Sequence, residues 1–439
     1  MNIQTKLPAY KGEKWVIAQL PQQAQSWQLG RFHSTDKDND DSLLSEELSY
    51  LLQKNTWSWP KQPIFFFSDL HADSDAFWAS LVASGGIKKT GKADKKFKLT
   101  QIGRKARFII GGDCFDKGAS NLRLLRSIRL LIDSGAKVNI LAGNHDIRTK
   151  LGMRAVDLNK DPKSEHFFIR MGSKVVPLLK EIQQEYLQGK NALKGIPDEA
   201  ECRRRLYPSD SWFDEFPIAA IWMMPEKTIN KEIKRLREKI SQFEHDCKKE
   251  GLCLRTVYAA TLKWQQLFLH PKGEFYWYFK KMSLMLKKGS FLFVHAGLDD
   301  RIASMINKKG LKHLNRQFKH NINEELFEFY YGPLANTIRT KYREIDMPLS
   351  KHGVKMINDK GIYALVHGHK NMRYGQRIML RKGIVNFECD ASVDLHTRNK
   401  ESLGGHGAAV TIFSPKKIIL GISTDYPYIK VFDPKHLIK

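Results

Sequence analysis

The stretch RFIIGGDCFDKG, residues 107–118, decides the fold, because a short apolar run passes directly into a turn rich in glycine and carboxylate. Residues 107–110 suit a strand that is buried on both faces. Four other apolar runs pass into polar clusters in the same way, and they cover residues 64–67, 138–141, 291–294 and 364–366. The sequence therefore predicts a set of strands that each end in hydrophilic side chains.

Helical segments separate the first three of these strands. Residues 75–83 follow Ser74 and residues 121–133 follow Ser120, and serine is favourable at the N-terminal cap of a helix. Alternation of strands and helices predicts a layered α/β fold with parallel strand pairing. Because ligands bind at the carboxyl ends of the strands in such sheets, we expect the polar clusters to converge.

The first polar clusters contain side chains that bind divalent metal ions. Asp69 and His71 lie two residues apart, so in an extended segment both point to the same side and can hold one ion. Asp113 carries two oxygens, which can bridge two ions about 3.5–4 Å apart. Carboxylate, imidazole and amide ligands suit manganese, iron, zinc or magnesium, whereas the lack of thiolates argues against a structural zinc site.

The later clusters can complete the coordination of a second ion. Asn144 offers a neutral oxygen, and His295 and His369 each follow a predicted strand. His367 lies beside His369 and is a weaker candidate ligand, with a place in the strand as the alternative.

A second set of residues fits acid catalysis and phosphate binding. His145, next to Asn144, is the natural proton donor to a leaving alkoxide, and Asp116 can orient its imidazole. Lys117 and Arg148 flank these residues and can bind the phosphate oxygens. Arg339 and Arg343, in a segment with helical spacing between two ligand motifs, are weaker candidates for the same role, with a surface position as the alternative.

These motifs resemble those of the calcineurin-like metallophosphoesterase superfamily, in its phosphoprotein-phosphatase and diadenosine-tetraphosphatase-like branch. The resemblance covers roughly residues 62–150 and 288–425. It implies a four-layer α-β-β-α sandwich with two divalent ions, manganese being expected and iron or zinc the alternatives. The implied ligands are Asp69, His71 and Asp113 for the first ion and Asp113, Asn144, His295 and His369 for the second.

Two departures from the family pattern concern the substrate. Lys117 stands where phosphoprotein phosphatases carry arginine, so a point charge replaces a bidentate fork. The motifs Gly-Asn-His-Asp and His-Ala-Gly, together with this lysine, are more similar to the diadenosine-tetraphosphatase-like branch. In addition, the stretch between Asn144 and His295 is much longer than the family pattern requires.

We therefore divide the chain into an N-terminal extension (1–60), a first core part (61–150), a largely helical insert (151–287) and a second core part (288–439). In the extension, an acidic loop is expected at 36–41 and a helix at 43–52. In the insert, residues 227–248 and 254–269 are expected to form a helical hairpin. The hairpin can be a cap packed on the core or a lid that selects the substrate.

The composition limits the kinds of partner and the location that we expect for this protein. The formal net charge is +26, from 73 Lys and Arg against 47 Asp and Glu, which either favours an anionic substrate or serves solubility. No apolar run is long enough to span a membrane, no secretory signal is visible, and the five cysteines show no disulfide pattern, so we expect a cytoplasmic protein that does not bind membranes. The sequence gives no indication of the oligomeric state.

These observations bear on four candidate functions. A metal-dependent phosphatase that hydrolyses phosphate monoesters, with phosphoproteins as substrates, is the leading hypothesis. A hydrolase of nucleotides or dinucleoside polyphosphates is the alternative. Nucleic acid fits the charge, but no recognition motif favours it. A scaffold without activity is disfavoured, because all the expected ligands and the acid are present.

Overall fold

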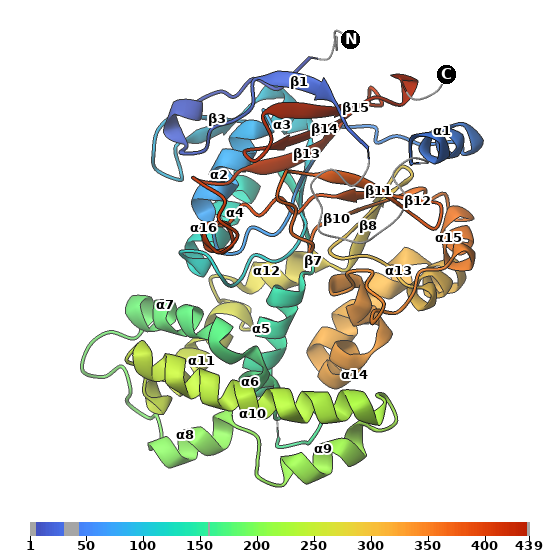
Figure 1. Cartoon of the computed structure of the whole chain (residues 1–439). Helices are drawn as coiled ribbons and strands as arrows, with labels where there is room; N and C mark the ends of the chain where they lie inside the picture. The colour runs from blue at the N-terminus through green and yellow to red at the C-terminus, as the bar shows by residue number, and fades with distance from the viewer. Residues whose placement is uncertain (1–5, 30–43, 157–158, 437–439) are drawn as a thin grey trace.

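The computed structural model describes residues 6–29, 44–156 and 159–436. Figure 1 shows a core of sheets and flanking helices above a group of helices that the chain forms between its two core segments. The acidic loop expected at 36–41 lies outside the described residues.

Two main sheets form the core. The larger has eight strands, in the order β1 (Gln23–Ser26), β15 (Tyr428–Phe432), β14 (Ile419–Ser423), β13 (Ala409–Phe413), β2 (Ile64–Phe67), β5 (Arg107–Ile110), β6 (Lys137–Leu141) and β7 (Met282–Ser283). The smaller has five, in the order β11 (Arg377–Arg381), β12 (Ile384–Glu388), β10 (Ala364–His367), β9 (Phe291–Val294) and β8 (Met285–Lys288). A hairpin of β3 (Ile87–Lys89) and β4 (Phe97–Leu99) stands apart from both.

The strands that lead to the polar clusters are parallel. β2, β5 and β6 pair in parallel within the large sheet, and β9 and β10 do so within the small sheet. Their carboxyl ends therefore meet along a common rim, as the sequence predicted.

The two sheets face each other across an apolar layer. Phe66 of β2 points into this layer and meets Phe293 of β9, with ring centroids 5.7 Å apart. Its neighbours Phe65 and Phe67 point to the other face, where Phe67 contacts Phe77. Because successive side chains of a strand alternate between faces, a continuous aromatic run fills both layers.

Helices cover the outer faces of both sheets. On the large sheet these are α2 (Ser74–Ala83) and α4 (Asn121–Asp133), with the short α3 (Gln101–Lys105) beside β4. Helix α5 (Asn144–Ala155) instead leads from the end of β6 to the insert, where it packs on α6. On the small sheet α13 (Asp300–Glu324) packs on β8 and on α15 (Lys351–Asn358). The predicted α/β sandwich in four layers is confirmed.

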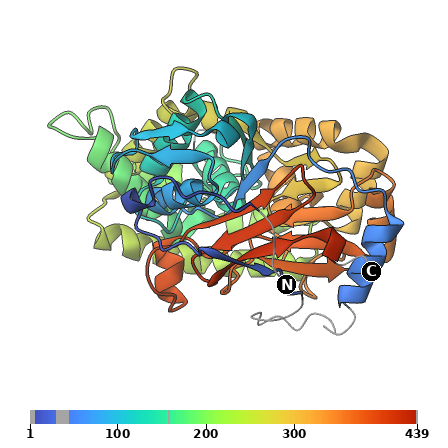
Figure 2. The same cartoon turned by 90° about the horizontal axis from the view of Figure 1, so that it is seen from above.

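Smaller elements complete the core. Helices α14 (Leu326–Tyr331), η4 (Pro333–Ile338), α16 (Leu395–Lys400) and η5 (Pro434–His436) belong to the second half of the chain. In the N-terminal extension, η1 (Glu13–Trp15) precedes β1, and α1 (Leu44–Lys54) packs on β11. Seen from above, α1 lies at the edge of the molecule away from the green helices of the insert (Figure 2).

The sequence placed two details wrongly. Helix α2 is capped by Asp73, whose carboxylate accepts from Ala76 N at 2.9 Å, and Ser74 is the first helical residue instead of the cap. The residues around Arg339 and Arg343 are not on a regular helix, because η4 ends at Ile338 and an irregular segment follows.

Residues 159–281 are helical for most of their length. The elements are α6 (Phe167–Met171), η3 (Gly172–Val175), α7 (Val176–Tyr186), α8 (Glu199–Leu206), α9 (Trp212–Ala220), α10 (Glu226–Lys249), α11 (Leu254–Phe268) and α12 (Tyr276–Lys281). Helix α10 packs on α6, η3 and α9, and α11 packs on α7 and α8 (Figure 1).

These helices are joined to the core by buried contacts. Phe268 of α11 packs on Phe115, in the loop that carries Asp113, with ring centroids 5.8 Å apart. Gln265 donates to Met153 O of α5 at 2.8 Å. Glu181 of α7 accepts hydrogen bonds from the backbone N–H groups of Asn121 and Leu122 at 3.0 Å, at the start of α4. The insert helices and the core therefore share one hydrophobic interior.

Candidate metal centre

The predicted ligands lie at the carboxyl ends of five strands, on loops with unusual backbone geometry. Asp69 and Asp113 have φ of 53° and 55°, His71 has 42° and His369 has 66°. For a residue other than glycine, the left-handed backbone conformation costs about 1–3 kcal/mol. Residues in this conformation tend to cluster at functional sites. Here it turns each side chain toward the rim that the two sheets share.

Two groups of side chains converge closely enough to hold metal ions. One contains His71, Asp113 and His145, and the other contains Asp113, His295 and His369. Within each group the ligand atoms lie within 4.8 Å of one another. Asp113 belongs to both groups, as expected of a carboxylate that bridges two ions.

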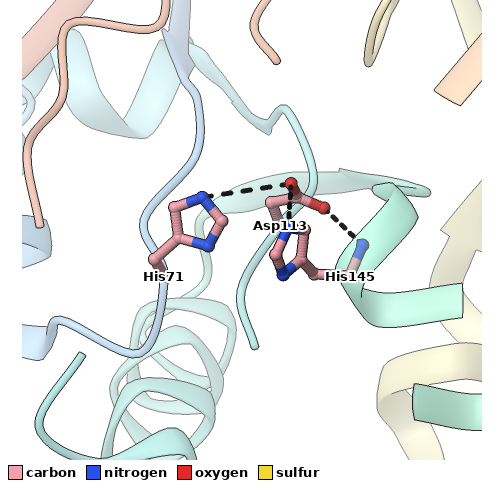
Figure 3. Close-up of side chains that lie close together, drawn as sticks. All are labelled: His71, Asp113 and His145. Carbon is pink, nitrogen blue, oxygen red and sulfur yellow. Dashed lines mark hydrogen bonds and ion pairs between the residues drawn. The ribbon is translucent and has the colours of Figure 1, made fainter. Parts of the chain in front are cut away.

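Asp113 is the centre of this arrangement (Figure 3). Its Oδ2 lies 3.4 Å from His295 Nε2, 3.9 Å from His145 Nε2 and 4.0 Å from His71 Nε2. Its Oδ1 accepts from the backbone N–H of His145 at 2.8 Å. Burial alone would raise the pKa of Asp113, but the surrounding imidazoles outweigh burial and hold the pKa well below its ordinary value.

Each of the three predicted histidine ligands has one ring nitrogen against a backbone carbonyl. His71 Nδ1 lies 3.1 Å from Phe115 O, His295 Nδ1 lies 2.8 Å from Gly111 O, and His369 Nε2 lies 3.1 Å from Arg339 O. A carbonyl only accepts, so these nitrogens carry the proton in the neutral rings. The other nitrogen of each ring then has a lone pair available, which is the arrangement found in metal-binding histidines.

Asn144 places its amide among these lone pairs. The position of its side-chain oxygen lies 2.9 Å from His369 Nδ1, 3.1 Å from His295 Nε2 and 3.3 Å from Asp113 Oδ2. Four atoms that can each donate an electron pair therefore share one small volume. A divalent cation fits this donor set. Without a cation, the Asn144 amide satisfies the other three atoms only when its NH₂ group, instead of its oxygen, points toward them.

Gly143 allows this approach. A Cβ atom at this position would lie 2.1 Å from Asp113 N and 2.3 Å from Asp113 Oδ1. Any side chain would therefore displace the loop that carries the shared carboxylate.

Asp69 lies at the same rim but just outside both groups. Its Oδ2 accepts from His369 N at 2.9 Å and from Ser68 Oγ. Burial is the main cause of its raised pKa, and the neighbouring charge of Asp113 adds to it. In the part of the chain that the structure describes, no hydrogen bond reaches Oδ1, so that oxygen is available to a metal ion.

The expected acid and its partner are in contact. His145 Nδ1 lies 2.7 Å from Asp116 Oδ2, and Arg148 Nη2 donates to the same oxygen at 2.7 Å. Burial alone would raise the pKa of Asp116, but the hydrogen bond to His145 and the charge of Arg148 lower the pKa below its ordinary value. The charged carboxylate fixes the ring so that Nε2 faces Asp113.

The predicted phosphate-binding residues take different positions. Lys117 Nζ lies 2.9 Å from His71 Nε2, beside the first group. Arg148 and Arg339 line a cavity of about 160 Å³, and Asn144 lines it too. Arg343 lies outside this cavity: its guanidinium pairs with Asp346 at 3.1 Å, and its side chain is 60% exposed.

His367 also lies outside the two groups. It is the last residue of β10, its Nδ1 is 3.1 Å from Gly368 O, and burial lowers its pKa to about 4.

Two residues of the site were not singled out from the sequence. Arg170 of α6 lines the same cavity, although it lies in the insert, far from any motif. Asp146 accepts from the backbone N–H groups of Asp113 and Cys114 at 2.8 Å and of Gly143 at 3.1 Å. The last position of the Gly-Asn-His-Asp motif was the available signal for Asp146, whereas nothing in the sequence marks Arg170.

The model of a known protein family matches part of this chain. The model of the calcineurin-like phosphoesterase family matches residues 62–250, which include Asp69, Asp113 and Asn144. The predicted resemblance to this family is confirmed over residues 62–250 of the chain. No curated protein matches the sequence significantly.

Three of the solved structures that match this chain are phosphatases of low similarity to it. A cold-active protein tyrosine phosphatase is 13% identical, with a TM-score of 0.42, and the match covers 95% of this chain and 96% of that one. A second, from a psychrophilic Shewanella species, is 12% identical, with a TM-score of 0.41 and coverage of 95% and 98%. A protein serine/threonine phosphatase from Saccharomyces cerevisiae is 10% identical, with a TM-score of 0.35 and coverage of 89% and 87%. Likeness at this level does not define a substrate.

Among the described residues, no helix is both long and apolar enough to cross a membrane.

Proposed function

We propose that this chain is a dinuclear metal-dependent phosphatase that hydrolyses phosphate monoesters, with phosphoproteins as its substrates. The observation that carries the proposal is that Asp113 is shared by two groups of potential metal ligands. The proposed ligands are those expected from the sequence, with Asp69 binding through Oδ1, and His367 is not assigned to the centre. We also propose that the chain divides at residues 60, 150 and 287. The proposed metal is manganese, and the proposed location is the cytoplasm.

The donor set determines what the site can do. When bound, a pair of divalent ions supplies Lewis acidity and lowers the pKa of a water molecule so that it can attack phosphorus. The other requirements fall on the chain itself. Asn144, Arg148 and Arg339 surround a cavity large enough for a phosphoryl group, and the two guanidinium groups offer N–H donors to its oxygens.

His145 is proposed to protonate the leaving alkoxide. Asp116 holds Nδ1, so Nε2 is the atom that faces the site. Burial lowers the pKa of His145. The negative charge of an arriving phosphate ester acts in the opposite direction and favours the imidazolium that donates the proton.

A hydrolase of nucleotides or dinucleoside polyphosphates is the second candidate. Lys117 stands where phosphoprotein phosphatases carry arginine, and this difference favours the second candidate. Because Lys117 lies against His71, the binding of phosphate groups is left to Arg148, Arg170 and Arg339.

One set of assays tests the proposal. The chain is stripped of metal, reloaded with Mn²⁺, Fe²⁺, Zn²⁺ or Mg²⁺, and assayed on p-nitrophenyl phosphate, on phosphoserine and phosphotyrosine peptides and on diadenosine tetraphosphate. We expect metal-dependent release of phosphate, with the peptides preferred. Preference for the dinucleotide by orders of magnitude would replace the first candidate with the second, and no hydrolysis with any metal would contradict both.

A further inference from the structure

The cavity beside Asn144 is unusually rich in arginine. Arg148 comes from the core helix α5, Arg339 from the segment after η4, and Arg170 from the insert helix α6. Arg170 pairs through Nε with Glu232 of α10 at 2.6 Å, and Arg339 donates through Nη1 to Tyr330 O at 2.8 Å. Among the described residues no hydrogen bond uses Arg170 Nη1 or Arg339 Nη2, so each guanidinium keeps donors for another partner.

The insert adds two lysines next to these arginines. Lys239 of α10 lies against the junction of α6 and η3, with Nζ 3.5 Å from Met171 O. Gly172 makes room for it: a Cβ atom there would lie 2.5 Å from Lys239 Nζ, and φ of 64° also favours glycine. Lys174, two residues further on, extends from the same 3₁₀ turn. We call Arg170, Lys174 and Lys239 the insert cations.

These cations are close enough to repel one another. Partial desolvation, with the positive charge of Arg148 among its neighbours, lowers the pKa of both Lys174 and Lys239 to about 8. Within the described parts of the chain, neither lysine has an ion-pair partner within 4 Å. The acidic neighbours are Glu232, which is paired with Arg170, Asp116, which is paired with His145 and Arg148, and Asp113, which lies among the imidazoles of the metal centre. Positive charge therefore exceeds negative charge beside a cavity that leads to the metal-binding rim.

Such an excess destabilises the protein alone and is relieved by a bound anion. The cavity itself, at about 160 Å³, is too small for a whole drug-sized ligand, which typically needs about 300–1,000 Å³. It accepts a compact charged group instead. Lys174 and Lys239 do not line the cavity but add positive charge near Arg148, which does.

We infer that the insert cations and Arg148 form a second anion subsite, which binds a phosphoryl group next to the one that is hydrolysed. The inference rests on the proposed function, since it names the kind of ester that this site prefers. The substrate then carries at least two phosphoryl groups close together. Either a nucleoside polyphosphate or a peptide with neighbouring phosphorylated residues supplies this chemistry.

The test compares substrate pairs that differ by one phosphoryl group. kcat/KM is measured for AMP and ADP, and for a singly and a doubly phosphorylated version of one peptide, with metal in constant excess. We expect the wild-type chain to favour the second phosphoryl group by about tenfold or more, as charge-assisted hydrogen bonds allow. The pair that shows the preference identifies the source of the second group.

The variant Lys174→Ala/Lys239→Met should reduce that preference to about twofold or less. The matched control is Lys231→Ala/Lys234→Ala, which removes the same charge from the exposed side of α10 and should keep the preference. Equal loss with both double variants would mean that overall charge is responsible, and an unchanged preference in the first variant would overturn the inference.

A binding measurement separates this inference from the proposed function. Pyrophosphate and orthophosphate are titrated calorimetrically into the metal-free chain, where catalysis plays no part. Tighter binding of pyrophosphate that is lost in Lys174→Ala/Lys239→Met would support the subsite even if no ester were hydrolysed. Equal binding of the two anions by the wild-type chain would overturn it.

Discussion

The rim of the two sheets and the helical insert contribute to one site in different ways. At the rim, each ligand follows a buried strand within a few residues, and the backbone adopts left-handed φ at Asp69, His71, Asp113 and His369. In the insert, Arg170 and Lys174 come from the consecutive helices α6 and η3, and Lys239 comes from α10, far along the sequence from both. The comparison suggests that the rim determines the reaction, whereas the insert determines which phosphate ester is accepted.

Removal of metal should have the largest effect on activity, because it acts on the rim, which is proposed to carry out the reaction. Dialysis against a chelator should lower kcat/KM on p-nitrophenyl phosphate by more than about 10³-fold, since the nucleophile and the charge stabilisation both depend on the ions. Activity should return with Mn²⁺. Circular dichroism serves as the control for folding, and full activity after complete removal of metal would refute a metal-dependent rim.

The next largest effect is expected for His145→Ala. Loss of a general acid typically lowers kcat by about 10²–10⁴-fold. Metal content should stay at the wild-type value, because His145 is proposed to donate a proton and not to bind the ions. His320→Ala, at a histidine whose side chain is 58% exposed, is the control. Loss of one ion per chain in His145→Ala would instead make this residue a ligand, as its place in the first group would allow.

A smaller effect is expected where the rim and the insert meet. Arg339→Lys should raise KM for a monoester by about tenfold, with a lesser change in kcat, because a point charge replaces a fork that binds two oxygens. Arg343→Lys, four residues away and paired with Asp346 at the surface, should change neither constant. Equal effects of the two substitutions would remove Arg339 from the phosphate cavity.

The smallest effect is expected for Glu181→Gln, which weakens a connection between the insert and the core. Glu181 accepts from the first N–H groups of α4, so its loss should cost about 1 kcal/mol of unfolding free energy. Urea denaturation measures this change, and Glu199→Gln at an exposed position is the control. A large drop in kcat without loss of stability would mean that the insert takes part in the reaction itself.

The same comparison explains how much could be predicted from the sequence. The strands that lead to the proposed metal ligands could be predicted, because each ligand is adjacent in sequence to the apolar run that positions it. These ligands are Asp69, Asp113, Asn144, His295 and His369. Parallel pairing then brought them together, as expected. The orientation of the Asp69 carboxylate was not predictable, since it depends on His369 N, 300 residues away.

Residues whose position depends on tertiary packing could not be assigned. Arg339 and Arg343 looked equivalent in sequence, but the irregular chain after η4 turns one into the cavity and leaves the other at the surface. Arg170 gave no signal, because its place beside the cavity results from the packing of α6 against α10. Asp73 replaced Ser74 as the cap of α2, since both residue types cap helices well and the sequence alone does not choose between them.

Metal stoichiometry, measured by inductively coupled plasma mass spectrometry on the purified chain, tests the central claim most directly. The account predicts two divalent ions per wild-type chain and one or none in Asp113→Asn, with the fold retained. Two ions in both proteins, or none in the wild-type chain after incubation with excess Mn²⁺, would contradict the claim that Asp113 joins two metal sites.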